Sequence, residues 1–159
     1  MSDHPRSLAE PQFPDDDGRA APQLVAALEA AAGGDDVGVL AALPQVRVFV
    51  PIVPVLGERA TDGSDKSADM AAVLMTGADG RVALLAFSSV ATLEAWNPAA
   101  RPVPVLGGDA ARAALDEQAS ALLLDLGAPG FTVVETDDLH HLADGHRLLR
   151  TPDGPAWVV

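Results

Sequence analysis

Two apolar segments joined by a short polar turn constrain the fold more than any other feature of this sequence. Residues 71–75 (AAVLM) and 82–86 (VALLA) flank the turn at 76–81, which contains the dipeptide Asp79-Gly80. Asp-Gly accommodates the positive φ angles that tight antiparallel connections need, so the pattern predicts a β-hairpin. Because neither segment alternates with polar residues, both faces of the resulting sheet are expected to be covered.

Further elements follow from periodicity and from residues that begin or end helices. Helices are predicted over residues 22–32, 36–43, 88–96, 109–119 and 136–144, with Asp36, Ser88 or Ser89, Asp109 and Thr136 as N-terminal caps. Strands are predicted over residues 46–50, 121–126, 131–135 and 155–159, and residues 101–105 are extended because prolines alternate there. Pro51 and Pro54 remove donors from the continuation of the first strand, which is therefore expected at a sheet edge or a bulge.

The irregular mixture of helices and strands predicts the α+β class, in which α and β elements pack as a mixed α/β domain. The hairpin argues against a doubly wound parallel sheet. A chain of 159 residues is long enough for one hydrophobic core and too short for two. We therefore expect a single domain over residues 21–159, with a mixed, mostly antiparallel sheet and packed helices. Residues 1–20, which contain three prolines and an acidic run, are expected to form a disordered or loosely attached arm.

The charge balance argues against several classes of partner. Ten Lys and Arg residues oppose 23 Asp and Glu residues, and the formal net charge is -13. Nucleic acids require a basic face and anionic membranes attract basic segments, so neither partner is expected. The sequence shows no apolar run long enough to span a membrane, no apolar core of a secretory signal, and no cysteine. These features together predict a cytoplasmic protein.

Motifs of catalysis and cofactor binding are missing from the sequence. It contains neither G-x-G-x-x-G nor G-x-x-x-x-G-K-[ST], and no serine stands in a G-x-S-x-G elbow. Without cysteine, thiolate nucleophiles and thiolate metal sites are excluded. We therefore expect no catalytic residues and no cofactor. A serine triad whose members meet only in space stays open as an alternative.

Two polar clusters share the composition of metal sites but not their spacing. Residues 62–69 begin like a calcium loop, yet Lys66 stands where an oxygen ligand belongs. His140 and Asp144 would share a helix face, whereas His141 would point about a quarter turn away. Histidines near the C-terminal end of a helix are stabilised by the helix dipole and need no ligand. No metal site is expected.

The stretch from Ser88 to Val105 is the main candidate for a binding site. It combines the hydroxyls of Ser88 and Ser89 at a helix start, the indole of Trp96, and Arg101 in a stiff proline-rich segment. Helix N-termini hold anions through free N–H groups, and Trp and Arg dominate interface hot spots. The same residues would serve only the fold if the tryptophan were core, the serines caps and the arginine a surface charge.

Lys66 and Asp69 complete the candidate binding residues. Lys66 is the only lysine of the chain, and a desolvated lysine can act as a reactive amine. Because Asp65 precedes it and Asp69 follows closely, we expect its side chain to be solvated and cationic instead.

Five short segments occur in an order that a known family shares. They are KSADM at 66–70, TGADGR at 76–81, AFSS at 86–89, Trp96, and ARPVPV at 100–105. In this order they resemble the N-terminal domain of the SseB family in its high-GC bacterial branch, over about residues 22–145. The resemblance implies no catalytic residues, because the family name refers to a phenotype, enhanced serine sensitivity, and not to a reaction. We expect no counterpart of the second domain found in longer relatives.

Three functions stay open. The resemblance and the missing motifs favour a non-catalytic, cytoplasmic protein-interaction module whose partner is another protein. The alternative is a small-molecule or anion-binding regulatory domain that uses the Ser88/Ser89 helix N-terminus with Arg101 or Lys66. The third is an enzyme with dispersed residues. A pocket beside Ser88 and Arg101 would favour the second function, and a flat apolar surface there the first.

Overall fold

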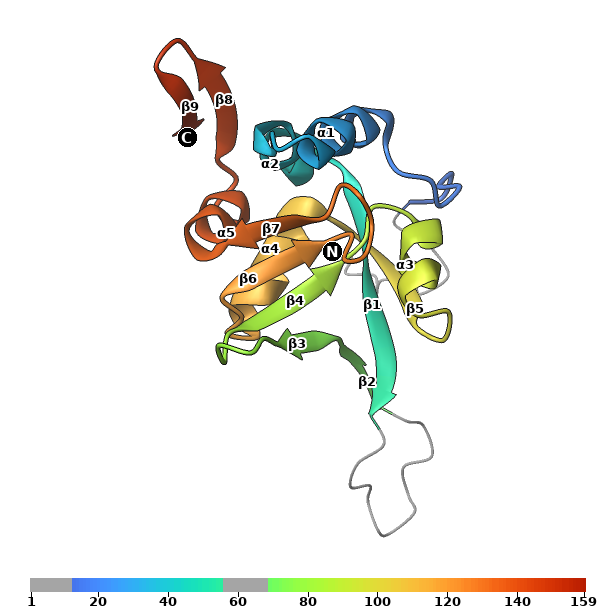
Figure 1. Cartoon of the computed structure of the whole chain (residues 1–159). Helices are drawn as coiled ribbons and strands as arrows, with labels where there is room; N and C mark the ends of the chain where they lie inside the picture. Colours follow the sequence, from blue (N-terminus) through green and yellow to red (C-terminus); the bar gives the residue numbers. More distant parts are fainter. Residues whose placement is uncertain (1–12, 56–68) are drawn as a thin grey trace, which may run out of the picture.

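Helices and strands alternate along the part of the chain that the computed structural model describes, residues 13–55 and 69–159 (Figure 1). The helices are α1 (Pro22–Ala32), α2 (Val37–Ala42), the short 3-10 helix η1 (Leu43–Gln45), α3 (Val90–Trp96), α4 (Gly107–Asp116) and α5 (Thr136–Ala143). The strands are β1 (Arg47–Val55), β2 (Asp69–Ala72), β3 (Leu74–Thr76), β4 (Val82–Ala86), β5 (Arg101–Leu106), β6 (Ala121–Leu124), β7 (Thr132–Glu135), β8 (Arg147–Thr151) and β9 (Gly154–Val158). None of the helices in these two ranges is long and apolar enough to cross a membrane.

The strands form three sheets, of which the first two are joined. β1 lies between β2 and β5, and the second sheet has the order β3-β4-β6-β7 with β4 and β6 parallel. Phe49 and Phe87 exchange backbone hydrogen bonds of 2.7 and 2.8 Å, which link β1 to the end of β4. β8 and β9 pair separately. The architecture confirms a single α+β domain whose strand pairs are mixed and mostly antiparallel.

Two hydrophobic clusters hold the layers together. The larger one joins the sheets to α1, α2, α4 and α5 through buried Leu, Val and Ala side chains. The smaller one lies under α3 and comprises Phe49, Leu85, Phe87, Leu93 and Ala100. Full burial of a Leu or Phe side chain contributes about 1.5–3 kcal/mol. The smaller cluster therefore fixes α3 against the sheet.

The predicted hairpin forms, but only part of its first strand belongs to it. β3 and β4 pair across the turn, whereas residues 71–72 pair with β1 in the other sheet. The change occurs at Val73, whose N–H donates to the carbonyl of Pro51 at 3.2 Å and whose carbonyl accepts from the N–H of Leu85 at 3.3 Å. β4 is buried as expected, but β3 is an edge strand with Leu74 exposed. The expectation that both strands are covered was therefore wrong for β3.

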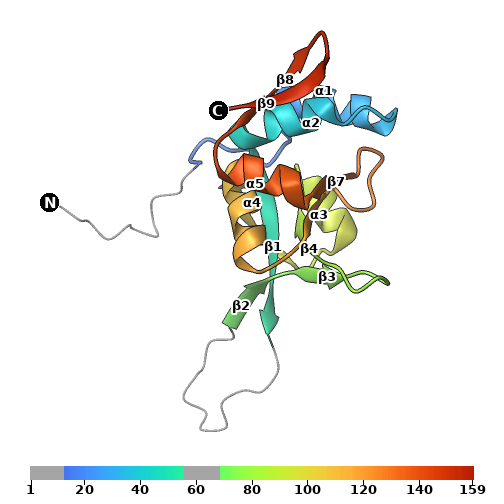
Figure 2. The same ribbon diagram turned by 90° about the vertical axis from the view of Figure 1, so that its left-hand side faces the viewer.

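Prolines divide β1 into two halves with different partners. Residues 47–51 pair with β5, residues 53–55 pair with β2, and only Ile52 pairs with both. Because Pro54 has no N–H to donate, the second half suits a position whose single neighbour is β2, whereas the first half also bonds to Phe87 through Phe49. This confirms that the second half of β1 lies at an edge. Together with β2 it extends away from the helices in both views (Figures 1 and 2).

Of the predicted N-terminal caps, only Ser89 makes the expected bond. Asp36 precedes α2 without a cap bond, and the carboxylate of the neighbouring Asp35 accepts the N–H of the first residue of α2 at 3.2 Å. Thr136 lies inside α5, where its hydroxyl donates to the carbonyl of Ser120 at 2.6 Å. Short polar side chains close together compete for the same N–H groups, so the capping residue is not decided by type alone.

Helix α4 begins earlier than predicted because a glycine permits close packing. A Cβ at Gly107 would lie 2.0 Å from the carbonyl oxygen of Leu43, so only glycine lets α4 start against η1. Asp109 lies within the first turn of the helix. The helix ends at Asp116 and not near Ala119, and Gln118 beyond it adopts a φ of 63°.

The N-terminal arm differs from its prediction where the structure describes it. Asp16 forms an ion pair with Arg47 of β1, and the carbonyl of Gly18 accepts the N–H of Val90 at 2.9 Å. The expectation of a loosely attached arm does not hold for residues 13–20, because Arg47 and the N–H of Val90 in the domain bind them. Residues 1–12 lie outside the described residues.

The C-terminal end forms a hairpin of which only one strand was predicted. β9 occupies the expected position, whereas β8 (RLLRT) was missed because it does not alternate regularly. Leu148 is buried in the larger cluster, and Trp157 packs against it from β9. The hairpin lies beside α2 in both views (Figures 1 and 2).

Candidate functional site

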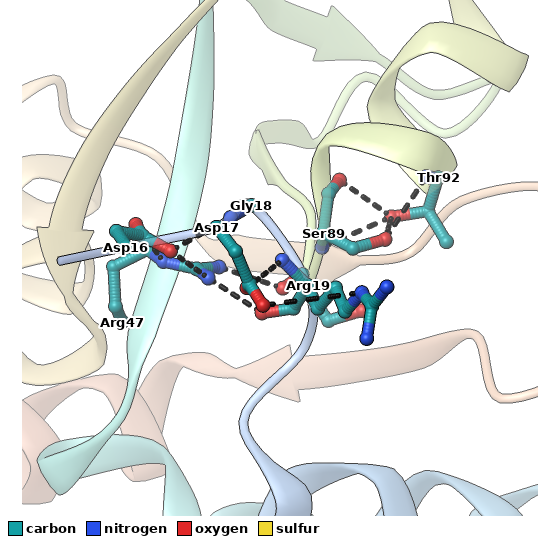
Figure 3. Close-up of polar contacts among 8 residues, drawn as sticks. Asp16, Asp17, Gly18, Arg19, Arg47, Ser89 and Thr92 are labelled. Carbon is teal, nitrogen blue, oxygen red and sulfur yellow. Dashed lines mark hydrogen bonds and ion pairs between the residues drawn. The ribbon is translucent and has the colours of Figure 1, made fainter.

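Helix α3 begins at a serine–threonine pair that satisfies its first N–H groups. Ser89 Oγ accepts the N–H of Thr92 at 3.1 Å, and Thr92 Oγ1 accepts the N–H of Ser89 at 3.3 Å (Figure 3). This reciprocal capping box is typical of Ser and Thr at helix starts. The prediction that a serine caps this helix is confirmed, with Ser89 as the cap.

The side chain of Ser88 is buried, so its hydroxyl does not lie on the surface. Its exposed fraction is 2%, as is that of Asp125, which follows β6. The N–H of Ser88 donates to Asp125 Oδ1 and its hydroxyl donates to Oδ2, both at 2.7 Å. The hydroxyl of Thr92 lies 3.1 Å from Oδ1. These donors compensate the carboxylate for its lost hydration and tie the start of α3 to the end of β6.

Asp125 is a site residue that sequence reasoning missed. Its φ is 60°, in the left-handed region that Asp tolerates better than most residues, and Gly127 follows with a φ of 93°. An Asp followed two residues later by Gly at the end of an apolar strand is a turn signal that could have revealed it. The predicted strand at 121–126 was too long for the same reason, since β6 ends at Leu124.

Four amide groups around the start of α3, those of Ser88, Ser89, Val90 and Thr92, have acceptors within the protein. Besides the bond from Ser88 to Asp125, the N–H of Val90 donates to the carbonyl of Gly18, and that of Thr92 donates to Ser89 Oγ. An external anion would depend on these donors. The protein's own oxygen atoms therefore occupy these four donors of the predicted anion site.

Trp96 ends α3 and lines a hollow beside it. Its ring packs on Phe87, with ring centroids 5.6 Å apart and 31° between the planes, and the residue is half-buried. The hollow has a volume of about 320 Å³ and lies between α3 and the turn that follows β6. Its lining residues are Thr92, Ala95, Trp96, Leu126, Gly127 and Ala128. Apart from the Thr92 hydroxyl and the indole N–H of Trp96, the side chains that line it are apolar.

The other predicted binding residues lie elsewhere. Arg101 is exposed at the start of β5, opposite Ile52, and does not line the hollow. Asp69 begins β2 and pairs with Val55, on the other side of β1 from β5. Lys66 lies outside the described residues. Of the predicted site, the structure gathers only the two serines and the tryptophan, all of them along α3.

Arg47 is a second residue that sequence reasoning missed. Its guanidinium donates two hydrogen bonds to the Asp16 carboxylate, from Nε to Oδ2 and from Nη2 to Oδ1, both at 2.7 Å (Figure 3). Nη1 donates to the carbonyl of Ser88 at 2.9 Å, Nη2 donates to the carbonyl of Arg19, and the guanidinium carbon lies 4.1 Å from the Phe49 ring centroid. Only 10% of the Arg47 side chain and 16% of the Asp16 side chain are exposed. No local signal links these partners, which are 31 residues apart.

The surroundings of Asp16 favour its charged form. Burial raises the pKa of the Asp16 carboxyl, but hydrogen bonds from Arg47 and from the N–H of Gly18, with the charge of Arg47, outweigh burial and lower the pKa below its ordinary value. The Gly18 N–H donates to Asp16 Oδ1 at 2.9 Å. A lowered pKa means that the charged carboxylate binds the folded domain better than the neutral acid does.

The histidines at the end of α5 contact one another and a tryptophan. His141 Nδ1 lies 2.8 Å from His146 Nδ1, and the His141 ring stacks on Trp157 with centroids 4.7 Å apart and 8° between the planes. His140 is exposed. Within residues 13–55 and 69–159, no three His, Asp or Glu residues are grouped as metal ligands would be. The contacts of the His141–His146 pair join α5 to the C-terminal hairpin.

A family model covers most of this chain. Residues 24–141 match the SseB protein N-terminal domain. The chain belongs to the SseB family. The match confirms the resemblance to the SseB N-terminal domain, and its span extends from α1 into α5, including α3, the hollow and Arg47. No curated protein and no solved structure matches the chain significantly. The described arm, 13–20, and the β8–β9 hairpin lie outside the matched SseB span.

Proposed function

We propose that this SseB-family domain is a non-catalytic protein-interaction module, and that the hollow beside α3 holds an apolar side chain of a protein partner. The observation that carries the proposal is the lining of the hollow, where Trp96, Leu126 and Ala128 offer apolar surface that is open to the outside. Tryptophan is enriched among the residues that dominate interface energetics, and anchor side chains fill pockets of this kind.

The size and chemistry of the hollow favour a side chain over a polar metabolite. Small-molecule sites measure about 300–1,000 Å³ and contain several convergent polar groups. At about 320 Å³ this hollow is at the lower end of that range, and Thr92 supplies the one hydroxyl of its lining. A polar metabolite would leave its own groups unpaired there, whereas an apolar side chain gains about 25 cal/mol for each Å² that it buries.

The contacts of Ser88 and Ser89 weigh against the regulatory anion site. Both hydroxyls take part in internal hydrogen bonds, and α3 is a helix of only 7 residues. Arg101 stays in the proposal as an exposed cation on an acidic protein, suited to a carboxylate at the rim of the partner. Arg101→Ala is accordingly expected to slow association at low salt while the melting temperature stays constant.

The proposal is tested with two exposed alanines that differ in position. Ala95 lines the hollow, and Ala99 lies beyond the end of α3. An arginine at either position adds the same charge and is expected to change the free energy of unfolding by less than about 0.5 kcal/mol. In affinity capture from a lysate of the source cells, Ala95→Arg should lose at least one protein that the wild type and Ala99→Arg both retain. An identical set of retained proteins for both arginine variants would contradict the proposal.

A further inference from the structure

The N-terminal arm fills a site that the SseB domain itself provides. On the domain side are the guanidinium of Arg47, stacked on the ring of Phe49, and the N–H of Val90. On the arm side are the Asp16 carboxylate and the Gly18 carbonyl. The three receiving residues all lie within the matched span 24–141, whereas the arm precedes that span. The residues that form the site thus belong to the domain, and the groups that fill it belong to the arm.

The arm binds through a short pattern, Asp-x-Gly. Asp16 Oδ1 accepts the N–H of Gly18 at 2.9 Å, which closes a tight turn. Gly18 has a φ of 81°, and a Cβ there would lie 3.1 Å from Val90 Cγ2. The turn and the close approach therefore both favour glycine. Two N–H groups of the Arg47 guanidinium bind the two oxygens of a carboxylate, and the close approach to Val90 favours glycine. The site therefore recognises the acid and the glycine together.

We propose that Arg47, Phe49 and Val90 form a recognition site for an Asp-x-Gly segment of a protein partner, and that the chain's own arm fills this site until such a segment displaces it. The site is separate from the hollow, which none of these three residues lines. The proposal therefore goes beyond the proposed function and does not depend on it.

Two observations support an exchange of segments. None of the residues 13–20 is buried as a whole, so the arm can leave without opening either hydrophobic cluster. The Arg47 side chain, by contrast, is only 10% exposed with the arm in place, and departure of the arm removes the carboxylate and carbonyl acceptors of its Nε and Nη2. The site consequently favours an acidic occupant whenever the arm leaves it.

The tether sets how strongly the arm competes. A segment joined to its site by a short flexible linker acts at an effective concentration of about 1 mM. A partner segment must therefore bind more tightly than the arm, or be held nearby by other contacts. Weakening the arm should raise the apparent affinity of the site for a segment supplied in solution.

The test uses full-length variants and the synthetic peptide FPDDDGRA, the sequence of residues 13–20, with a fluorescent label. Asp16→Ala removes the carboxylate of the arm and Gly18→Val removes its close approach, so each variant opens the site by a different route. Fluorescence anisotropy should show that both variants bind the peptide at least tenfold more tightly than the wild type does. Circular dichroism melts establish that each variant is folded.

The matched control is Asp17→Ala, which removes the same charge from the neighbouring position. Asp17 is an exposed residue that bonds within the arm to Arg19, and it takes no part in the Asp16–Arg47 pair. This variant should bind the peptide no better than the wild type.

Three results would overturn the proposal. The first is no binding to Asp16→Ala or Gly18→Val at 1 mM peptide, on the scale of the tether's effective concentration of about 1 mM. The second is equal binding of a peptide with Asn in place of Asp16, which would show that Arg47 does not select the acid. The third is a concentration-dependent dimer of the wild type that the peptide dissociates, because the occupant would then be the arm of a second copy and not a partner.

Discussion

The arm and the C-terminal hairpin both lie outside the matched SseB domain, yet they are attached to it by different forces. The arm is held by the ion pair of Asp16 with Arg47 and by backbone bonds, and none of its described residues is buried as a whole. The hairpin contributes Leu148, 6% exposed, to the larger cluster, and both side chains of its ion pair, Arg150 and Asp35, are exposed.

This difference predicts different responses to conditions. Polar attachment depends on the charge of a carboxylate, so it weakens at acidic pH and can be replaced by a competing acid. Apolar attachment depends on buried area and shape, which pH and moderate salt hardly change. The attachment of the arm should therefore depend on pH and on competing acids, whereas the hairpin is attached as part of the core.

The largest expected effect comes from the apolar anchor of the hairpin. Leu148→Ala removes a buried side chain opposite Trp157 and should lower the free energy of unfolding by about 2–3 kcal/mol. Leu149→Ala is the control. The Leu149 side chain is 43% exposed, so its removal should cost less than about 1 kcal/mol of unfolding free energy. Urea denaturation measures both values. Equal losses for the two leucines would mean that the hairpin is not anchored in the core.

The polar anchor of the arm is expected to contribute less. Asp16→Asn preserves size but removes the charge that Arg47 binds, and should cost about 1–2 kcal/mol, because a hydrogen-bonded charge near the surface keeps part of its hydration. Asp17→Asn should leave the unfolding free energy unchanged within about 0.5 kcal/mol. An equal loss of unfolding free energy for Asp16→Asn and Leu148→Ala would mean that the arm and the hairpin are held equally strongly.

The pH dependence separates the two attachments further. The pKa of the Asp16 carboxyl is lowered in the folded protein, so its contribution is complete above the unfolded value of about 3.9 and is lost as pH falls through the folded pKa. The stability difference between wild type and Asp16→Asn should accordingly shrink as pH falls below about 4. The difference between wild type and Leu148→Ala should stay constant. A difference for Asp16→Asn that persists to the lowest pH would show that its charge is not what holds the arm.

The class of the fold was predictable from sequence because it rests on local patterns. Continuous apolar runs, an Asp-Gly turn and proline positions each act within a few residues, and they indicated β3–β4, β5 and the edge half of β1. The division of residues 71–75 between two sheets was not predictable, since Val73 bonds to β1 on one side and to β4 on the other. The start of α4 depended in the same way on the approach of Gly107 to Leu43.

The candidate site divides along the same line. Ser89 and Trp96 were found because a capping serine and a tryptophan at a helix end are visible within α3. Asp125 and Asp16 were missed because their partners lie 37 and 31 residues away in the sequence. Acidic residues are numerous in this chain, so charge type alone could not single these two out. Only the fold shows which carboxylates are buried.

The smallest expected effect concerns the ion pair of the hairpin. Arg150 Nη2 lies 3.0 Å from Asp35 Oδ2, and the two side chains are 61% and 49% exposed. Exposed pairs of this kind contribute little, because water already solvates both charges, and Arg150→Gln should therefore cost less than about 0.5 kcal/mol. Arg150 is the better partner to replace, since the Asp35 carboxylate also accepts the N–H of Val37 at the start of α2. Urea denaturation at low and at 0.5 M salt measures the effect, and the small difference should vanish at high salt because exposed charges are screened. A loss above about 1 kcal/mol that survives high salt would mean that the hairpin, like the arm, is held by charge.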